Sequence, residues 1–381
     1  MSNLSSRDLE LGARLDRLSL AYAPASEQAD PIRSPASYER PEDREVAAWI
    51  GAAFAYGRVE TILGSVDRIL RPLGNRPARA LDSVADFARF AREELAGFRH
   101  RFHSASDAAA LLYAIAMARA EAGSVRAFFE REYRPEERDV GPLLTRVVSR
   151  LLALDYRPAI GRRTLPRDSP VRFFFPDPAA GSACKRWNLY LRWMVRKDAL
   201  DFGLWPAIPT SRLVIPTDTH VHRVARRLGL TRRKAADWKT AREITDRLAR
   251  FDPQDPVRYD YALCRIGEEG ICRPEIALTR CGECPLGTGC PTGRRRLRGI
   301  QPVVIPRNPP PSPPSSSRAL RPSCHPERSE GSVSLSNAVF RSGQAPRGIC
   351  VSVDSGLQLR TGSARDLCPS RPQPSVQDRV A

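Results

Sequence analysis

The sequence predicts an all-α fold, and three observations support this prediction. Apolar residues recur at the spacing of one helix face in several segments, and short stretches rich in Pro and Gly separate these segments. Patterns of alternating apolar and polar residues, which would indicate strands, are scarce. We therefore expect a helical body of about ten helices that ends at residue 299.

Three segments show the helical pattern most clearly, because their apolar residues follow the i, i+3, i+4, i+7 spacing of a buried helix face. The first segment contains Val59, Ile62, Leu63, Val66, Ile69 and Leu70. The second contains Leu144, Val147, Val148 and Leu151. The third contains Val221, Val224, Ala225 and Leu228, and Gly229 directly after it is a candidate C-cap.

The chain changes character at residue 300, so we divide it into a helical domain at 1–299 and a tail at 300–381. The tail is rich in Pro, Ser and Arg and cannot bury enough apolar area to offset its ordering entropy, which predicts disorder. Its segment CHPERSEGSVSLSN resembles translated repeat elements that extend bacterial reading frames. A spurious read-through would leave Cys324, Cys350 and Cys368 without a role, and a functional basic tail is the alternative.

Composition and charge favour a polyanionic partner. The chain carries 61 Lys and Arg against 43 Asp and Glu, a net charge of +18. Such a balance suits nucleic acid, because each neutralised phosphate releases condensed counterions, although an Arg-rich coding bias explains the charge equally well. No apolar run approaches the ~20 residues of a membrane span, and the first residues lack a secretory apolar segment. We expect a cytoplasmic, nucleoid-associated monomer without a membrane partner.

Four of the nine cysteines form a group with the spacing C-x8-C-x2-C-x5-C: Cys272, Cys281, Cys284 and Cys290. In a cytoplasmic protein such a group indicates a metal site rather than disulfides. Four thiolates hold either an iron–sulfur cluster or structural zinc. One C-x2-C pair with two outlying cysteines favours a [4Fe–4S] cluster, since zinc ribbons generally use two such pairs. Cys184 and Cys264 lie outside the group and are expected to be buried packing residues.

The segment RCGECPLGTGCP resembles the iron–sulfur loop of endonuclease III and the related adenine glycosylase, members of the helix-hairpin-helix DNA glycosylase superfamily. The resemblance implies a two-lobed helical fold closed by a [4Fe–4S] loop at 272–290. It also implies that basic residues beside the loop contact the DNA backbone. The residues at these positions are Arg273, Arg280, Arg294 and Arg295. A solvated helix end is the alternative explanation for the arginine run.

Two further segments resemble the same superfamily. In GSACKRWN, Gly181 and Asn188 match a turn and a helix position that contact nucleic acid, and Lys185 matches the catalytic lysine. In IPTDTHVHRVARRLG, Asp218 matches the catalytic aspartate at a helix start. The phrases RWMVRKD, DTHVHRVARRLGL and DPVRYDYAL resemble an uncharacterised, domain-of-unknown-function branch of that superfamily.

The chemistry implied for Lys185 and Asp218 is base excision. A desolvated lysine can attack C1′ of a flipped-out nucleotide and form a Schiff base, which permits strand cleavage, while a carboxylate stabilises the cationic sugar. Taken singly, each residue has a simpler explanation. An aspartate before a periodic helix is most often only an N-cap, and a lysine on a helix usually lies at the surface. Tyr56 and Arg58 are candidates for filling the gap left by the flipped base, although a helix-joining turn at Gly57 explains them equally well.

These observations lead us to expect a DNA base-excision glycosylase with abasic-site lyase activity, acting on duplex DNA that is damaged or abasic. Two alternatives remain open: a non-catalytic nucleic-acid-binding protein with a structural cluster, and an N-glycosylase that acts on RNA.

Overall fold

The computed structural model describes residues 4–22, 30–273 and 279–298. All of these residues belong to one unit of the chain, Met1–Ile305. The tail predicted at 300–381 lies outside the described residues, so its disorder stays a prediction.

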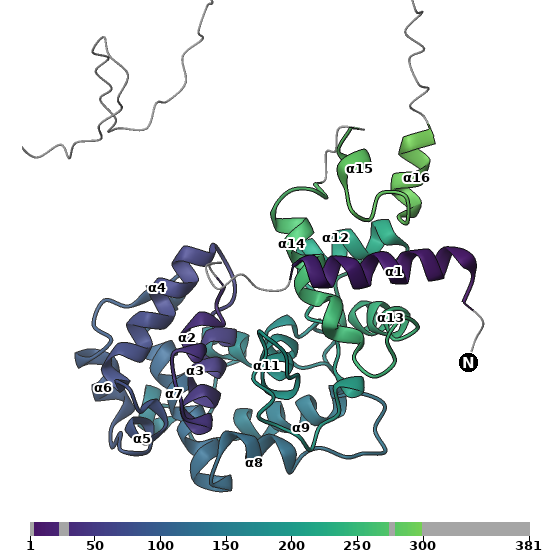
Figure 1. The fold of residues 1–381 in the computed structure, drawn as a ribbon. Helices are drawn as coiled ribbons and strands as arrows, with labels where there is room; N and C mark the ends of the chain where they lie inside the picture. Colours follow the sequence, from purple (N-terminus) through teal and green to yellow (C-terminus); the bar gives the residue numbers. More distant parts are fainter. Residues whose placement is uncertain (1–3, 23–29, 274–278, 299–381) are drawn as a thin grey trace, which may run out of the picture. The chain divides into compact units, whose positions relative to one another are not determined.

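The described residues are mainly helical, which confirms the all-α prediction (Figure 1). The α-helices in chain order are α1 (Ser6–Ala21), α2 (Arg33–Ala36), α3 (Pro41–Ala53), α4 (Val59–Leu70), α5 (Pro77–Asp82), α6 (Phe87–Glu93), α7 (Ala105–Ala122), α8 (Val125–Glu130), α9 (Gly141–Leu152), α10 (Arg157–Ile160), α11 (Lys185–Val195), α12 (Thr219–Leu228), α13 (Trp238–Leu248), α14 (Asp260–Glu268), α15 (Thr279–Glu283) and α16 (Pro291–Arg298). Short 3-10 helices add η1 (Arg71–Leu73), η2 (Pro170–Phe174), η3 (Thr210–Arg212) and η4 (Pro256–Tyr259).

The three segments with clear helical periodicity are α4, α9 and α12, and most of their predicted core residues are buried. Gly229 ends α12 in the left-handed conformation, at φ +77°, as expected of a C-cap. The described chain has more helices than the sequence predicts. The additional ones include α2 and α10, which have four residues each and are too short to show a periodic pattern.

A small hairpin, which the sequence does not predict, joins α6 to α7. Strand β1 (Arg99–His100) pairs antiparallel with β2 (His103–Ser104), so that His100 lies opposite His103. Two-residue strands cannot show alternation, which explains why the sequence gives no signal for them. The turn residue Arg101 has φ +54°, a left-handed conformation that is unfavourable for a residue with a side chain.

Helices α3 and α7 are surrounded by other elements. Helix α3 contacts α2, α4, α5, α7, α8 and α11, and α7 contacts α5, α6, α8, α10 and η2. Most residues of α7 from Ala108 to Arg119 are buried, so its apolar residues face neighbours on nearly all sides. Ser104 caps the start of α7, and Gly123 ends it with φ +84°.

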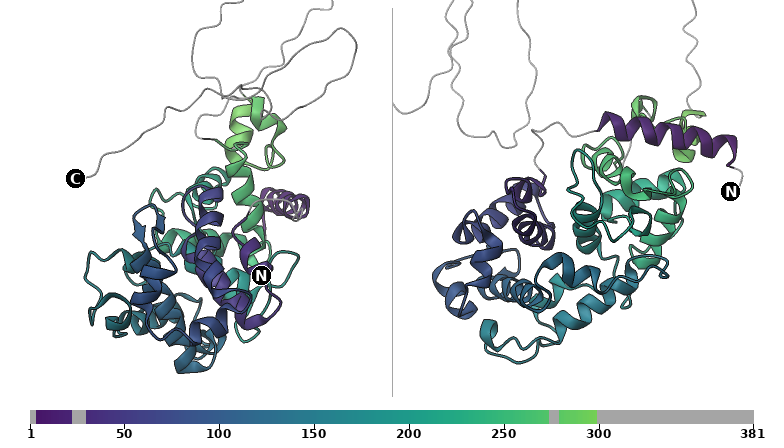
Figure 2. Two further views of the ribbon diagram at one scale, coloured as in Figure 1. Left: turned by 90° about the vertical axis from the view of Figure 1, so that its left-hand side faces the viewer. Right: turned by 60° about the horizontal axis from the view of Figure 1, so that its bottom comes forward.

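A second group of contacts links α12 to α14 and α16, and places α1 against α14 and η4. Although α1 is far away in sequence, it lies beside the cysteine-bearing C-terminal segment (Figure 2). Arg14 of α1 donates to the Pro285 carbonyl at 3.0 Å, and Thr288 donates to Glu10 of α1 at 3.1 Å. Among the described helices, none combines the length and the apolar character needed to cross a membrane.

Candidate functional site

A cavity of about 930 Å³ lies where four segments meet. Its walls come from the turn between α3 and α4, the first half of α11, the start of α12 and the inner face of α14. These walls carry Tyr56, Lys185, Asp218, Asp260 and Cys264. The structure therefore brings the two predicted catalytic residues, Lys185 and Asp218, to the same cavity.

Lys185 is the first residue of α11. The preceding Cys184 is the N-cap and has φ +50°, so the chain turns sharply into the helix at this point. The Lys185 side chain is partly buried, and its Nζ donates to the Ala55 carbonyl at 3.0 Å. This bond connects the start of α11 to the turn that follows α3 and holds the amine at the cavity wall.

Asp218 is the N-cap of α12, as its position before the periodic segment predicts. Its Oδ1 accepts from the backbone N–H groups of His220 at 2.8 Å and Val221 at 2.7 Å. The other oxygen, Oδ2, lies 3.8 Å from the Cys264 Sγ. Oδ1 therefore caps α12. Oδ2 accepts no backbone hydrogen bond within the described residues and lies beside the Cys264 thiol.

Cys264 contacts Asp218 and lies within electrostatic reach of Lys185. Burial raises the pKa of its thiol well above the ordinary value, the Asp218 carboxylate raises it further, and Lys185 opposes this rise. The sequence predicts Cys264 as a packing residue only. Its contact with Asp218 could not be found from spacing, because the two residues belong to different helices, α14 and the start of α12.

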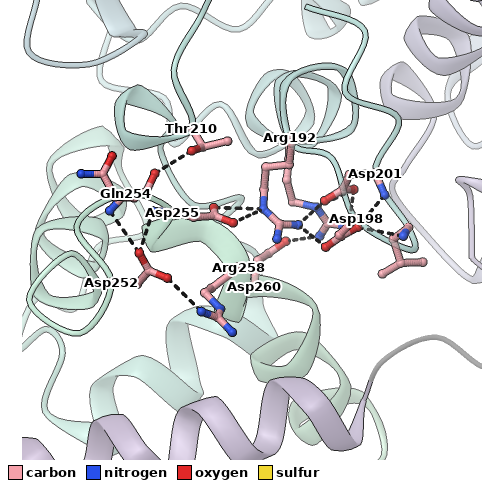
Figure 3. A network of polar contacts seen from close by, with 11 residues as sticks. Arg192, Asp198, Asp201, Thr210, Asp252, Gln254, Asp255, Arg258 and Asp260 are labelled. Atoms are coloured by element: carbon pink, nitrogen blue, oxygen red, sulfur yellow. Dashed lines mark hydrogen bonds and ion pairs between the residues drawn. The ribbon is translucent and has the colours of Figure 1, made fainter. Parts of the chain in front are cut away.

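A buried ionic network includes Asp260 of the cavity wall (Figure 3). Arg192 donates from Nη1 to Asp260 at 2.6 Å and from Nη2 to Asp201 at 3.2 Å. Burial raises the pKa of Asp260 to about 6, Arg192 opposes the rise, and the Asp218 carboxylate adds to it. Arg196 extends the network by pairing with Asp201 and with Asp255. The network joins α11 to α14, and Arg192 and Asp260 themselves line the cavity.

Aromatic side chains form another part of the wall and its rim. Phe173 lines the cavity, and the Arg186 guanidinium lies 3.7 Å from the centroid of its ring. The Tyr56 ring is 4.9 Å from Phe173, and Phe102 at the hairpin turn is 5.0 Å from Phe173. Phe102 and Phe173 are 48% and 40% exposed, which is unusual for such large apolar side chains. Neither residue stands out in the sequence, because both lie in short connecting segments.

The two hairpin histidines position Tyr56. His103 Nε2 lies 2.9 Å from the Pro170 carbonyl, which can only accept, so Nδ1 is left to accept from the Tyr56 hydroxyl. His100 Nε2 lies 3.0 Å from the Tyr56 carbonyl. Because a carbonyl oxygen can only accept, Nε2 donates this hydrogen bond. Burial lowers the pKa of His103 to about 4, so this histidine is neutral at physiological pH.

The remaining predicted contact residues lie in different surroundings. Arg58 precedes α4 with its side chain 87% exposed and 3.8 Å from Glu60. Gly181 has φ +85°, and its carbonyl accepts from the Trp238 N–H at 3.2 Å. Asn188 is only 1% exposed, and its Nδ2 donates to the Ala183 carbonyl at 3.1 Å. Asn188 therefore supports the turn before α11 and cannot reach a nucleic acid unless this turn rearranges.

The four cysteines predicted to hold a cluster lie in the last part of the described chain, between the end of α14 and the start of α16. Burial raises the pKa of Cys284, and Cys272, Cys290 and Cys281 each raise it further, so all four thiols lie within electrostatic reach. Within the described residues no three side chains of metal-ligating type are placed closely enough to hold a metal ion. The cluster therefore stays a prediction.

The surroundings of these thiols fit a cluster bound by thiolates. Arg227 donates from Nη1 to the Cys272 Sγ at 3.1 Å, and the Gly293 N–H donates to the Cys290 Sγ at 3.4 Å. Such donors stabilise sulfur that carries negative charge. A Cβ atom at Gly287 would lie 2.1 Å from the Cys281 carbonyl oxygen, so only glycine permits this close turn.

The four arginines predicted beside the cysteines differ in their exposure and hydrogen bonds. Arg273 is exposed. The side chain of Arg280 lies outside the described residues. Arg294 donates to the Thr288 and Gly289 carbonyls, at 2.9 and 3.0 Å, and Arg295 is exposed. Arg294 and Arg295 line a second cavity, distinct from the one that contains Lys185.

Comparison with protein families gives a match over residues 30–269 to a family described as "Protein of unknown function (DUF2400)". No curated protein matches the chain. The matched residues include Lys185 and Asp218 and end before Cys272, so the four cysteines lie outside them. Nothing in the match connects the chain to the helix-hairpin-helix DNA glycosylase superfamily, and the assignment to that superfamily from short motifs is wrong. Since the match covers more than half of the chain, the protein belongs to the DUF2400 family of proteins of unknown function.

Proposed function

We propose that the protein is an N-glycosylase that removes a base from damaged DNA and cleaves the abasic site through a Schiff base on Lys185. The observation that carries this proposal is that Lys185 and Asp218 line the same cavity, from the start of α11 and the start of α12. This proposal depends on the geometry and chemistry of the cavity, and not on membership of a glycosylase superfamily.

The identity of the basic residue in the cavity supports an amine-dependent reaction. The chain has only four lysines, Lys185, Lys197, Lys234 and Lys239, among 61 basic residues. Lys185 is partly buried and lines the cavity, whereas the other three are exposed. A guanidinium can bind phosphate, but only an amine can form a Schiff base, so a lysine at this position is informative in a chain dominated by arginine.

Lys185 and Asp218 have different roles in the proposed reaction. The neutral amine of Lys185 attacks C1′ as the bond to the base breaks, and the base leaves with the electron pair and takes up a proton. Loss of a proton from the lysine nitrogen and opening of the sugar ring give the Schiff base, from which β-elimination cleaves the strand. Asp218 Oδ2 stabilises the positive charge that develops on the sugar.

The size and lining of the cavity are suited to an extruded nucleotide. A volume of about 930 Å³ lies within the usual range for small-molecule sites. Phe173 and Tyr56 offer aromatic surfaces on which an unstacked base can lie, and Arg186 against Phe173 adds positive charge there.

Cys272, Cys281, Cys284 and Cys290 are the residues that would hold a [4Fe–4S] cluster. When bound, the cluster would act as a structural cross-link between the end of α14 and the start of α16. None of these four cysteines lines the cavity that contains Lys185 and Asp218, so base removal is assigned to those two residues alone.

Borohydride trapping tests the proposal. Full-length protein is incubated with a panel of damaged and abasic duplexes, with RNA as a separate arm, and the covalent complex is counted on a denaturing gel. Lys185→Ala should lose the complex, while Lys197→Ala, Lys234→Ala and Lys239→Ala should retain it. Absence of a complex from the wild type on every substrate, together with binding to DNA, would favour a non-catalytic binding protein instead.

A further inference from the structure

The second cavity has a strongly basic lining. It measures about 820 Å³ and is formed by the start of α1, the end of α12, the loop to α13, the last turn of α13 and the segment from Gly289 into α16. Helix α12 connects the two cavities, because Asp218 and Thr219 at its start line the first and Arg226 to Gly229 at its end line the second. A helix of ten residues rises about 15 Å, so the two cavities are separate.

Arginines converge on this cavity, hereafter the basic groove, from five segments. Five of them are exposed and form no ion pair with a carboxylate within the described part of the chain: Arg7, Arg226, Arg232, Arg247 and Arg295. Two acidic residues also line the groove. Asp8 pairs with Arg250 at 3.1 Å, and Glu243 accepts from Thr231 at 3.1 Å. Within the described residues, these five arginines are therefore not neutralised by a salt bridge.

Helix dipoles explain part of this arrangement. Arg226 and Arg247 lie in the last turns of α12 and α13, where a cation is favourable. Arg7 lies in the first turn of α1, where the dipole disfavours a cation, and Arg232 lies in a loop. Helix stabilisation therefore does not account for Arg7 and Arg232, whereas a bound anion would stabilise all five side chains together.

We propose that the basic groove binds phosphate groups of a polyanion, at a site independent of the cavity that contains Lys185. Guanidinium groups bind phosphate through paired hydrogen bonds, and several of them on one concave surface suit consecutive phosphates rather than a single small anion. The backbone of the DNA is the phosphate source that we infer. This choice of source rests on the proposed function, while the phosphate chemistry of the groove does not.

The test measures binding of a lesion-free, fluorescein-labelled duplex by anisotropy over a range of salt concentrations. Arg226→Gln and Arg232→Gln should each reduce the slope of log K against log salt by about one unit, and the double variant by about two. Arg89→Gln is the matched control. It removes the same charge from α6, where Arg89 pairs with Glu93, and should leave the slope near that of the wild type.

Inorganic tripolyphosphate distinguishes the two phosphate sources. If tripolyphosphate binding, measured by calorimetry, is lost in the double variant while the duplex slope is unchanged, the phosphate site stands and its ligand is a free polyphosphate. Unchanged slope and unchanged tripolyphosphate binding in the double variant would overturn the proposal. Borohydride trapping by these variants reports separately on Lys185, so that failure of the groove and failure of the glycosylase proposal are distinguishable.

Discussion

Arg192 and Asp260 form a buried ion pair, with Nη1 of the arginine 2.6 Å from Oδ2 of the aspartate and both side chains 5% exposed. The pair joins α11, which carries Lys185, to α14, which carries Cys264. Breaking one partner of a buried pair leaves the other charge poorly compensated, which is more damaging than losing an exposed pair.

Asp260→Asn should therefore lower the free energy of unfolding at neutral pH by about 3 kcal/mol, the low end of the range for such a change, because Asp201 still pairs with Arg192. Urea denaturation measures this. Glu60→Gln, in the exposed Arg58–Glu60 pair, is the control and should change stability by less than about 0.5 kcal/mol. Equal effects of the two variants would show that the buried pair has no special structural role.

The hairpin should make stability depend on pH through His103. Burial lowers its pKa to about 4, below the value of about 6.5 in an unfolded chain, so the folded state binds fewer protons between these values. Its contribution to stability is therefore complete above pH 6.5 and declines as the pH falls toward 4. Protonation of Nδ1 also removes the acceptor for the Tyr56 hydroxyl.

Thermal melts of wild type and His103→Gln across this pH range measure the effect. The wild type should lose more stability on acidification than the variant, which cannot titrate at this position. Parallel pH curves for the two proteins would show that His103 does not contribute in this way.

The sequence predicts the clearly amphipathic helices well and the connections poorly. The helices around Val66, Val148 and Val224 follow from periodicity, because each buries one stripe against a large core. The hairpin at Arg99–Ser104 is too short to show alternation. The exposed Phe102 and Phe173 gain meaning only from their mutual contact and from the cavity beside them.

In the candidate site, Lys185 and Asp218 can be singled out from the sequence. That they line the same cavity cannot be predicted from it. Cys264 and Asp260 belong to α14, and only packing of α14 against α12 brings them to Asp218. The basic groove is a similar case, since Arg7 and Arg232 are more than two hundred positions apart. Short motifs also misled the family assignment, because a few matching positions carry less information than a match over 30–269.

Asp218 can be tested with two substitutions that separate chemistry from structure. Asparagine caps a helix about as well as aspartate, so Asp218→Asn should keep the bonds to His220 and Val221 and retain near wild-type stability. Under the proposed function it should slow base removal on the order of a hundredfold, because the charge that stabilises the sugar cation is lost. Asp218→Ala should in addition cost about 1 kcal/mol of stability.

Single-turnover assays and thermal melts of both Asp218 variants give the two readouts. An Asp218→Asn protein with the wild-type rate would assign this residue to capping alone.

The cysteine group predicts bound iron. Anaerobically purified protein should be brown and contain about four irons per chain, and Cys284→Ser should lose the colour. Cys184→Ala is the control, because Cys184 is also a free cysteine but is buried, 2% exposed, and lies outside the group. Stoichiometric zinc without iron, in protein from iron-replete cells, would contradict the cluster and support the zinc alternative.

Phe173 is expected to bind an unstacked base. Its ring lines the cavity, lies 4.9 Å from Tyr56 and has the Arg186 guanidinium over it, and the residue is 40% exposed. Stacking of one base on an aromatic side chain contributes about 1–3 kcal/mol, so Phe173→Ala should weaken binding to a duplex with an extruded base by about 5-fold to 150-fold.

The measurement uses a duplex with 2-aminopurine opposite an abasic site, because the fluorescence of this base reports whether it is stacked. Wild type should bind this duplex more tightly than Phe173→Ala and quench the fluorescence, while the two proteins should bind a fully paired duplex alike. Leu20→Ala is the matched control: Leu20 is also a large exposed apolar residue, 70% exposed, but belongs to α1. If both substitutions weaken binding to the two duplexes by the same factor, Phe173 contributes general adhesion and not base stacking.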